Sequence, residues 1–297
     1  MPTWLLFLAP TLIWASTWHV ILYQLGSVPV LNSVGWRFGL AALLLALWAL
    51  QQRQSLKLPL RAHGLLLAAG VVQYSGNYWA VYEAERYIPS GLVAVLFALM
   101  VFGNALGTWW AFKQRSSRSF LLAALGGVAG VALVFWPEIA ASGARPQAGY
   151  GLAIGLGAVL AACVGNVLTL TLTRRGLPLL PILAWSMGYG AAFLLALSVF
   201  SGVGLHFDFR LPYVLSWLYL SVFGSVIAFA LYFKLAQRQG AAKASLMGVV
   251  IPVIALAVSA LFEGWKATPP ALLGMLMCVA SVWLAQRQPA AAVTKGS

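Results

Sequence analysis

The chain has 297 residues, of which 62% are hydrophobic and only 8% are charged. Soluble domains carry about 25% charged residues, so this composition excludes a soluble globular protein and indicates that lipid covers most of the surface. The net charge of +13 does not indicate nucleic-acid binding, because the basic residues stand in small groups between apolar runs of roughly 20 residues. Cys163 and Cys278 both lie within apolar runs, so we interpret them as packing residues rather than disulfide partners or metal ligands.

The apolar runs define the predicted helices. The first run starts almost at Met1 without a preceding Lys or Arg, which favours a spanning helix over a cleavable signal peptide. A spanning helix needs about 20 mostly apolar residues, and charges, glycines and prolines divide the chain into such runs. The predicted spans are residues 3–23, 30–50, 64–82, 90–112, 120–136, 150–173, 179–200, 212–233, 244–262 and 270–285. Because the runs are continuous rather than alternating, the sequence predicts an all-α polytopic membrane protein with ten transmembrane helices.

The loops between these spans alternate in charge. One side carries Arg53, Lys57, Arg61, Lys113, Arg115, Arg118, Arg174, Arg175, Lys234, Arg238, Lys243, Arg287 and Lys295. The other side carries Arg86, Arg145, Arg210 and Lys266 together with the five acids, Glu83, Glu85, Glu138, Asp208 and Glu263. An excess of Lys and Arg marks cytoplasmic loops, so both termini are predicted to be cytoplasmic. Residues 288–297 are predicted to form a disordered cytoplasmic tail.

The two halves of the chain resemble each other. The matched pairs are Pro29 and Pro178, Trp36 and Trp185, Met100 and Pro252, and Gly126 and Gly274; Ala84-Glu85-Arg86 also matches Ala236-Gln237-Arg238. We therefore predict one repeat at residues 1–140 and a second at 148–287. Each repeat would hold five spans, an odd number, so the second must enter the membrane from the opposite face. Inverted repeats of this kind are typical of transporters that work by alternating access.

These matched positions carry a family resemblance. The residues concerned are Trp14-Ala15-Ser16, Pro29 with Arg37, and Ala84-x-x-Tyr87-Ile88-Pro89-Ser90-Gly91-Leu92-Val93-Ala94; in the second half they are Gly240-x-x-x-Ala244-Ser245-Leu246, Pro252-Val253, Phe262-Glu263 and Gly274. Over residues 3–286 the chain resembles the drug/metabolite transporter superfamily, in its ten-helix branch with two EamA-type repeats. It departs from that pattern at Met100, where the first repeat usually has proline. Within the superfamily it looks most like the YddG-type aromatic amino acid exporters of bacterial inner membranes. The resemblance implies export of aromatic and other neutral amino acids.

The third span holds a polar and aromatic stripe that is the best candidate for a substrate cavity. Tyr74, Asn77, Tyr78 and Tyr82 recur at helical spacing and are predicted to face one way. Tyrosine offers a ring and a hydroxyl, which suit an amphipathic aromatic guest. The alternative is an aromatic belt at the membrane interface. Asn166 in the sixth span is a further candidate, and its alternative role is helix–helix hydrogen bonding.

Tryptophans and one arginine complete the candidate cavity. Trp14 and Trp18 lie four residues apart on one face of the first span, and Trp36 and Trp185 occupy matched positions in the two halves. Tryptophan is also common in interfacial belts. Arg37 is predicted to lie about 10 Å inside its span. There it could bind a substrate carboxylate in a fork, or it could snorkel to the interface or pair with carbonyl groups.

Energy coupling is predicted from the absence of acidic residues inside the predicted spans. His19 is the titratable candidate near neutral pH and lies close to a span end, so the sequence favours facilitated transport without obligatory proton exchange. A proton-coupled drug or metabolite efflux carrier is the alternative, followed by a channel and a membrane-embedded enzyme. The sequence has no HExxH, GxSxG or Walker motif. We therefore expect no catalytic residues, no metal or other cofactor, no nucleic acid and no ATPase partner, with small-molecule substrate and lipid as the binding partners.

Overall fold

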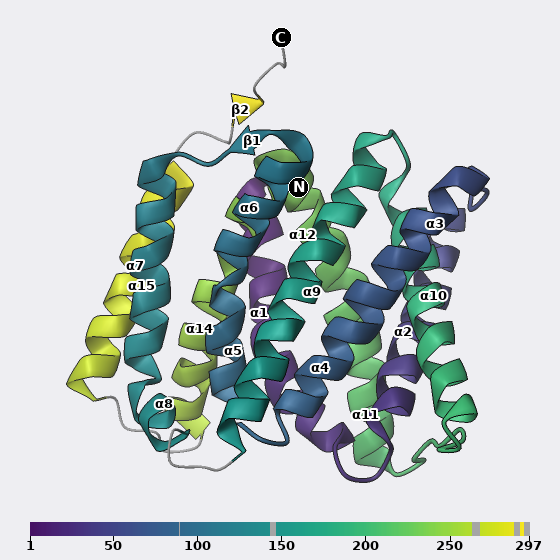
Figure 1. The fold of residues 1–297 in the computed structure, drawn as a ribbon, viewed down its shortest axis with the longest axis horizontal. Helices are drawn as coiled ribbons and strands as arrows, with labels where there is room; N and C mark the ends of the chain where they lie inside the picture. The colour runs from purple at the N-terminus through teal and green to yellow at the C-terminus, as the bar shows by residue number, and fades with distance from the viewer. Residues whose placement is uncertain (89, 143–146, 263–267, 288–291, 294–297) are drawn as a thin grey trace.

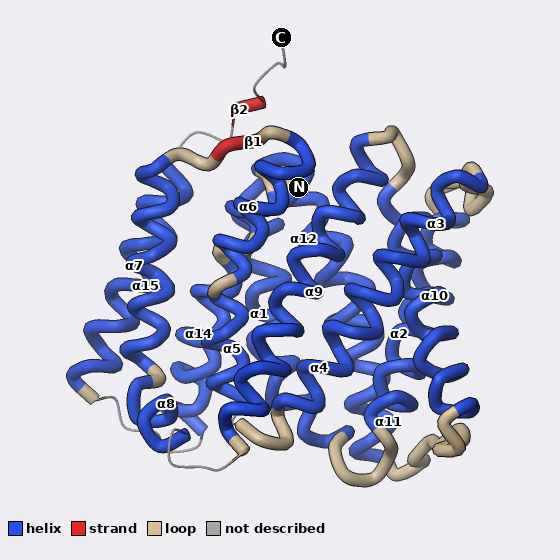
Figure 2. The backbone as a smooth tube through the Cα atoms, viewed as in Figure 1, coloured by secondary structure: helices blue, strands red, loops and turns tan. Residues whose placement is uncertain are grey.

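The computed structural model describes residues 1–297 except 89, 143–146, 263–267, 288–291 and 294–297. Long helices run side by side between two ends of the molecule, and the N terminus, β1 and β2 all lie at the same end (Figure 1). Helices α8 and α11 lie towards the opposite end (Figure 1). Almost the whole described chain is helical (Figure 2), which confirms the predicted all-α class.

The described helices fall into long and short apolar segments. Six helical stretches are long and apolar enough to cross a membrane, namely Thr3–Gln24, Val30–Gln51, Leu92–Phe112, Ala148–Arg174, Leu179–Phe200 and Leu211–Gln239. Three shorter apolar helices cover Arg118–Val134, Ala241–Ile254 and Pro269–Ala285. Each of these nine overlaps one predicted span. The remaining predicted span, residues 64–82, is built from three consecutive helical segments.

The observed bounds are as follows. The first half contains α1 (Thr3–Ile21), η1 (Leu22–Gln24), α2 (Val30–Gln51), α3 (Leu60–Ala69), η2 (Gly70–Gly76), α4 (Asn77–Ala84), α5 (Ser90–Ala98), α6 (Met100–Phe112), β1 (Gln114–Arg115), α7 (Arg118–Val134) and α8 (Trp136–Ser142). The second half contains α9 (Ala148–Arg174), α10 (Leu179–Phe200), α11 (Leu211–Tyr219), η3 (Leu220–Ile227), α12 (Ala228–Gln239), α13 (Ala241–Ala244), α14 (Met247–Phe262), α15 (Pro269–Arg287) and β2 (Ala292–Val293).

Proline and glycine set several of these bounds. Pro29 and Pro178 stand at the N-caps of α2 and α10, where the fixed φ of proline suits entry into a helix. Gly240 ends α12 with a φ of 87°, a conformation that glycine adopts without a steric penalty. Most of the predicted tail lies outside the described residues, but Ala292 and Val293 pair with β1 in an antiparallel ladder.

Two helical segments, η2 and η3, are π-helical. Each contains a serine whose hydroxyl lies within hydrogen-bond distance of the carbonyl oxygen five residues earlier: Ser75 with Gly70 at 3.3 Å and Ser225 with Leu220 at 3.0 Å. The Ser75 hydroxyl is closer still to the carbonyl oxygen of Gly190, at 2.9 Å. A π segment holds one more residue per turn than the flanking α-helix and is often found at functional sites. These segments therefore reorient the side chains that follow them.

A break also occurs where the sequence lacks the expected proline. The helix is interrupted at Leu99, between α5 and α6, although Met100 stands at that place. In the second half, Ser245 and Leu246 separate α13 from α14, and Pro252 lies inside α14. The break in the predicted fourth span therefore does not depend on proline.

The closest helix pairs join distant parts of the chain. Helix α2 packs along α10, and α7 packs along α15. The second pair depends on glycine, because a Cβ added at Gly274 would lie 2.5 Å from the carbonyl oxygen of Gly130. Small residues permit such close helix contact in membranes. The main hydrophobic core lies between the helices of the two halves, including α1, α2, α10 and α12.

Candidate functional site

A cavity lies in the interior of the helical assembly, between segments of both halves. It encloses about 90 Å³, several times the space that one water molecule needs. Helices α1, α4, α5 and α6 and segment η2 contribute from the first half, and α9, α12 and α14 contribute from the second. Larger hollows occur at helix ends, such as the one of about 570 Å³ beside Arg174 and Arg238. The central cavity is the candidate site because residues from both halves line it.

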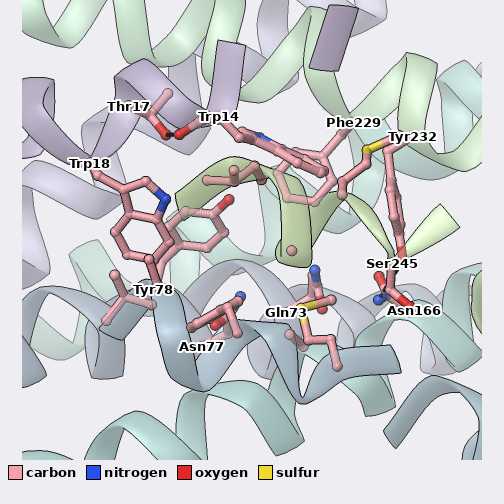
Figure 3. Close-up of a pocket in the computed structure, with 18 of the residues that line it drawn as sticks. Trp14, Thr17, Trp18, Gln73, Asn77, Tyr78, Asn166, Phe229, Tyr232 and Ser245 are labelled. Carbon is pink, nitrogen blue, oxygen red and sulfur yellow. Dashed lines mark hydrogen bonds between the residues drawn. The ribbon is translucent and has the colours of Figure 1, made fainter. Parts of the chain in front are cut away.

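Aromatic rings form much of its wall. Trp14 and Phe229 lie on one side of the cavity, and Gln73 and Asn77 lie on the opposite side (Figure 3). The ring of Trp14 is 5.3 Å from that of Phe229 and 5.4 Å from that of Tyr232. Its indole N–H donates to the carbonyl oxygen of Gly224 in η3, at 3.1 Å. The wall is thus built from aromatic rings in mutual contact, which suit a flat apolar guest.

Polar groups also line the cavity. Asn166 on α9 donates to the Tyr232 hydroxyl at 3.0 Å and to the side-chain oxygen of Asn104 at 3.3 Å. Several buried polar atoms of lining residues have no hydrogen-bond partner; they are Trp18 Nε1, Gln73 Oε1, Asn77 Oδ1 and Asn166 Oδ1. A buried polar group without a partner is costly. A polar guest in the cavity could satisfy such groups.

The described residues that line the cavity include no charged side chain. One buried cation lies directly behind the wall. The Arg37 guanidinium is 4.7 Å from the centre of the Tyr78 ring, which lines the cavity. Its Nε donates to the Ser225 hydroxyl at 3.0 Å, and its Nη1 donates to the Tyr82 hydroxyl at 3.5 Å. The Tyr82 hydroxyl in turn donates to Gln24 at 3.1 Å. Arg37 is therefore fixed in position by neutral groups.

The predicted site residues separate into three groups. Trp14, Trp18, Asn77, Tyr78 and Asn166 line the cavity. A second group is buried close behind Tyr78 and does not line the cavity: Tyr74, Tyr82 and Arg37. The rings of Tyr74 and Tyr78 both contact Phe38. The Arg37 guanidinium lies over the Tyr78 ring and donates to the Tyr82 hydroxyl. The side of this span that faces the cavity is centred on Gln73, Asn77 and Val81, one residue earlier in each turn than Tyr74, Tyr78 and Tyr82.

Trp36 and Trp185 lie outside the cavity. The Trp36 indole donates to the carbonyl oxygen of His206 at 2.9 Å, and the Trp185 indole donates to that of Leu56, also at 2.9 Å. Both bonds tie a helix of one half to a loop of the other. His19 is exposed and contacts the ring of Tyr23 rather than the cavity.

Sequence reasoning missed several lining residues. Gln73 stands four residues before Asn77, so helical spacing could have added it to the stripe. Tyr232, close to the end of a predicted span, and Phe229, one of many apolar residues, gave no distinguishing signal. Met100 also lines the cavity, although the sequence drew attention to it only as a missing proline.

The fold is that of a helical membrane protein with an internal cavity between its two halves. The pattern of the EamA-like transporter family matches the chain twice, over residues 1–136 and again over 149–286. The chain belongs to the EamA-like transporter family. The double match also places the same family unit in each half.

Individual relatives agree with this assignment. The chain is 36% identical over 105 residues to the uncharacterized inner membrane transporter YicL of Salmonella typhimurium, a match that spans 35% of this chain and about a third (34%) of YicL. It is 24% identical to the uncharacterized transporter YvbV of Bacillus subtilis, over 95% of this chain and 92% of YvbV. It is 21% identical to protein PagO of Salmonella typhimurium, over 94% of this chain and 91% of PagO. One protein of known crystal structure shares the fold with a TM-score of 0.76 at 15% identity, covering 95% of this chain and 96% of the other.

Proposed function

We propose that this chain is an inner-membrane exporter of small organic solutes, chiefly aromatic and other neutral amino acids, that works by alternating access. The observation that carries the proposal is the central cavity, which both halves line with aromatic rings and partnerless polar atoms. Clefts that combine apolar walls with a few polar groups are the usual form of small-molecule sites. The YddG-type resemblance adds the substrate class and the direction of export.

Alternating access requires two related halves, and we infer ten spans in two inverted repeats. The ten are counted by joining α3, η2 and α4, joining α5 with α6, joining α11, η3 and α12, and joining α13 with α14. In support, η2 and η3 stand about 150 residues apart, each with its serine bonded five residues back. Segment η2 packs against α10, and η3 packs against α2, its counterpart in the other half.

The matched tryptophans give independent support for inversion. Trp36 binds a loop that precedes α11, whereas Trp185 binds a loop that precedes α3. The α3 and α11 labels lie towards opposite ends of the molecule (Figure 1). Equivalent residues that make equivalent bonds at opposite ends are what an inverted duplication produces.

An amino acid would fit the chemistry around the cavity. Its ring or alkyl chain would pack on Trp14 and Tyr78, and its polar head would bond the free atoms of Gln73, Asn77 and Asn166. Arg37 lies close enough to the wall to attract a carboxylate once Tyr78 moves. The neutral lining favours a guest without net charge, and a facilitated mechanism that needs no ion gradient.

The test is an uptake and counterflow screen over all amino acids in proteoliposomes, with and without an imposed pH gradient. We expect aromatic amino acids to exchange down their gradients without a pH gradient, and Asn166→Leu to slow this exchange. The matched control is Trp36→Phe, which changes an indole outside the cavity. Absence of exchange for every amino acid would refute the substrate class, and accumulation that requires the pH gradient would refute the facilitated mechanism.

A further inference from the structure

Two glutamates in one turn at the end of α4 have opposite environments. Glu83 accepts from Arg86 at 3.1 Å and from the Tyr87 hydroxyl at 3.2 Å. Both carboxylate oxygens of Glu85 are buried, and neither has a hydrogen-bond partner. An isolated ionised carboxylate away from water is strongly disfavoured. Glu85 is therefore neutral in this conformation, whereas Glu83 is paired with Arg86.

The helical register relates Glu85 to the central cavity. Asn77 and Val81 line the cavity from α4, and Glu85 follows Val81 by four residues, which is close to one helical turn. It thus stands about 6 Å further along the same side of the helix. That position is between the cavity and the loop end of α4, which the proposed topology assigns to the outer face of the membrane.

Charged and titratable neighbours do not neutralise this carboxylate. On the same turn, Arg86 is paired with Glu83, and the Tyr82 hydroxyl donates to Gln24. From the segments packed against α4, Arg37 on α2 is held by Ser225 and Tyr82. Tyr150 on α9 packs its ring on Tyr87 at 5.0 Å, and Tyr74 in η2 packs on Phe38 and Phe229. None of these groups bonds Glu85.

We propose that Glu85 is a proton-binding site that controls access to the cavity from the α4 loop end. With a proton bound, the uncharged side chain stays buried and that end stays closed. Loss of the proton creates a charge that must reach water, so it favours an open conformation that hydrates Glu85. Burial raises the pKa of Glu85 from its usual 4.5 to about 8, which places the transition in an accessible pH range.

The proton therefore acts as a ligand of one conformation, and its effect follows from linkage. High pH at the α4 loop end should open the cavity, and low pH should close it. The opening of the cavity by high pH does not depend on the proposed transport function, but its influence on the rate of transport does. A site reached from one end alters the rate of facilitated transport without carrying a proton across.

Access can be measured without any substrate. Val81→Cys places a thiol on the cavity wall one turn below Glu85, and the native Cys163 and Cys278 are both buried. The rate of labelling with a small thiol reagent would be measured in detergent from about pH 6 to about pH 9. The same measurement on Val81→Cys with Glu85→Gln corrects for ionisation of the thiol itself, because glutamine mimics the protonated acid.

We compare the two proteins by the labelling rate of Val81→Cys with Glu85 divided by that of Val81→Cys with Glu85→Gln. This ratio should be near one at the lowest pH. It should rise at least about fivefold across the range, which is a typical size for an allosteric coupling. Glu83→Gln, which removes the paired acid of the same turn, should leave the rise unchanged. A ratio that stays constant with pH would overturn the proposal, as would loss of the rise in Glu83→Gln.

A second measurement keeps the proposal testable if a variant does not fold. Infrared titration of the otherwise unsubstituted protein should show a protonated carboxyl group at neutral pH that disappears near pH 8, and Glu85→Asp should shift its frequency. Absence of a protonated carboxyl group at neutral pH would refute the site. Neither measurement depends on flux, so failure of the amino acid screen would leave both results interpretable.

Discussion

Tyr78→Leu tests whether the aromatic wall of the cavity recognises aromatic substrates. The Tyr78 ring lines the cavity and lies 4.7 Å from the Phe38 ring. The Arg37 guanidinium lies over the Tyr78 ring, 4.7 Å from its centre. Leucine keeps most of the apolar volume but removes the ring. An aromatic pair contributes about 0.5–1.5 kcal/mol beyond the area that it buries, which corresponds to about a 2- to 13-fold change in affinity.

The expected result is therefore selective. The half-saturation concentration for counterflow of tryptophan should rise by about 2- to 13-fold, whereas that of leucine should change little. Loss of the buried cation–π contact with Arg37 should lower the stability of the folded protein by about 2 kcal/mol, which thermal unfolding in detergent would report separately.

Trp36→Leu is the matched control, because it also removes an aromatic ring but one that lies outside the cavity, 6.3 Å from Phe207. It should leave both half-saturation concentrations unchanged. Equal weakening of tryptophan and leucine in Tyr78→Leu would show that the ring supports the fold rather than the substrate. An equal effect of Trp36→Leu would place the recognition site elsewhere.

Three further predictions concern topology, packing and pH. A cysteine at Ser55 should react only with reagents that cross the membrane, and one at Gln147 should react with impermeant reagents from outside; the opposite pattern would reverse the proposed orientation. Gly274→Val should lower the unfolding temperature in detergent, because its Cβ would lie 2.5 Å from the Gly130 carbonyl oxygen and such overpacking costs about 1–3 kcal/mol; an unchanged temperature would mean that α7 and α15 can separate freely. Burial raises the pKa of Glu85 from 4.5 to about 8, so the folded state binds this proton more tightly than the unfolded chain does. The stability that proton binding at Glu85 contributes is therefore lost as pH rises from about 4.5 to about 8. Glu85→Gln should remove that slope from unfolding temperatures measured over the same pH range, and a slope equal to that of the parent protein would contradict the burial of this carboxyl group.

Helix positions could be predicted closely where local chemistry marks the ends. The predicted span 179–200 coincides with α10, and the predicted span 30–50 differs from α2 by one residue. In both cases a proline stands at the N-cap and an apolar run follows, so the signal is local. The break at Leu99 could not be predicted, because the expected marker was a proline and Met100 stands there instead.

The candidate site could be predicted in part. Asn77, Tyr78 and Asn166 were found because polar residues in an apolar span are conspicuous. Gln73 lines the cavity and Tyr82 does not, because tertiary packing turns inwards the face one residue earlier than the tyrosines, and local spacing does not decide which of two adjacent faces is turned inwards. Trp36 and Trp185 were predicted to be equivalent, but their bonds to distant loops depend on tertiary packing that a local pattern does not encode.

The extra residue within η2 has a consequence for insertions and deletions. In a regular α-helix the deletion of one residue rotates every following side chain by about 100°, which would disrupt the packing of a buried span. Deletion of one residue between Gly70 and Gly76 would instead convert the π turn into an α turn and leave the helix continuous. Because the extra residue is the one lost, α4 would keep its orientation, and Asn77 and Val81 would still face the cavity, whereas residues of the π segment, including Gln73, would shift. This short stretch is thus a place where a single-codon change could alter what the cavity binds while the membrane span itself remains intact.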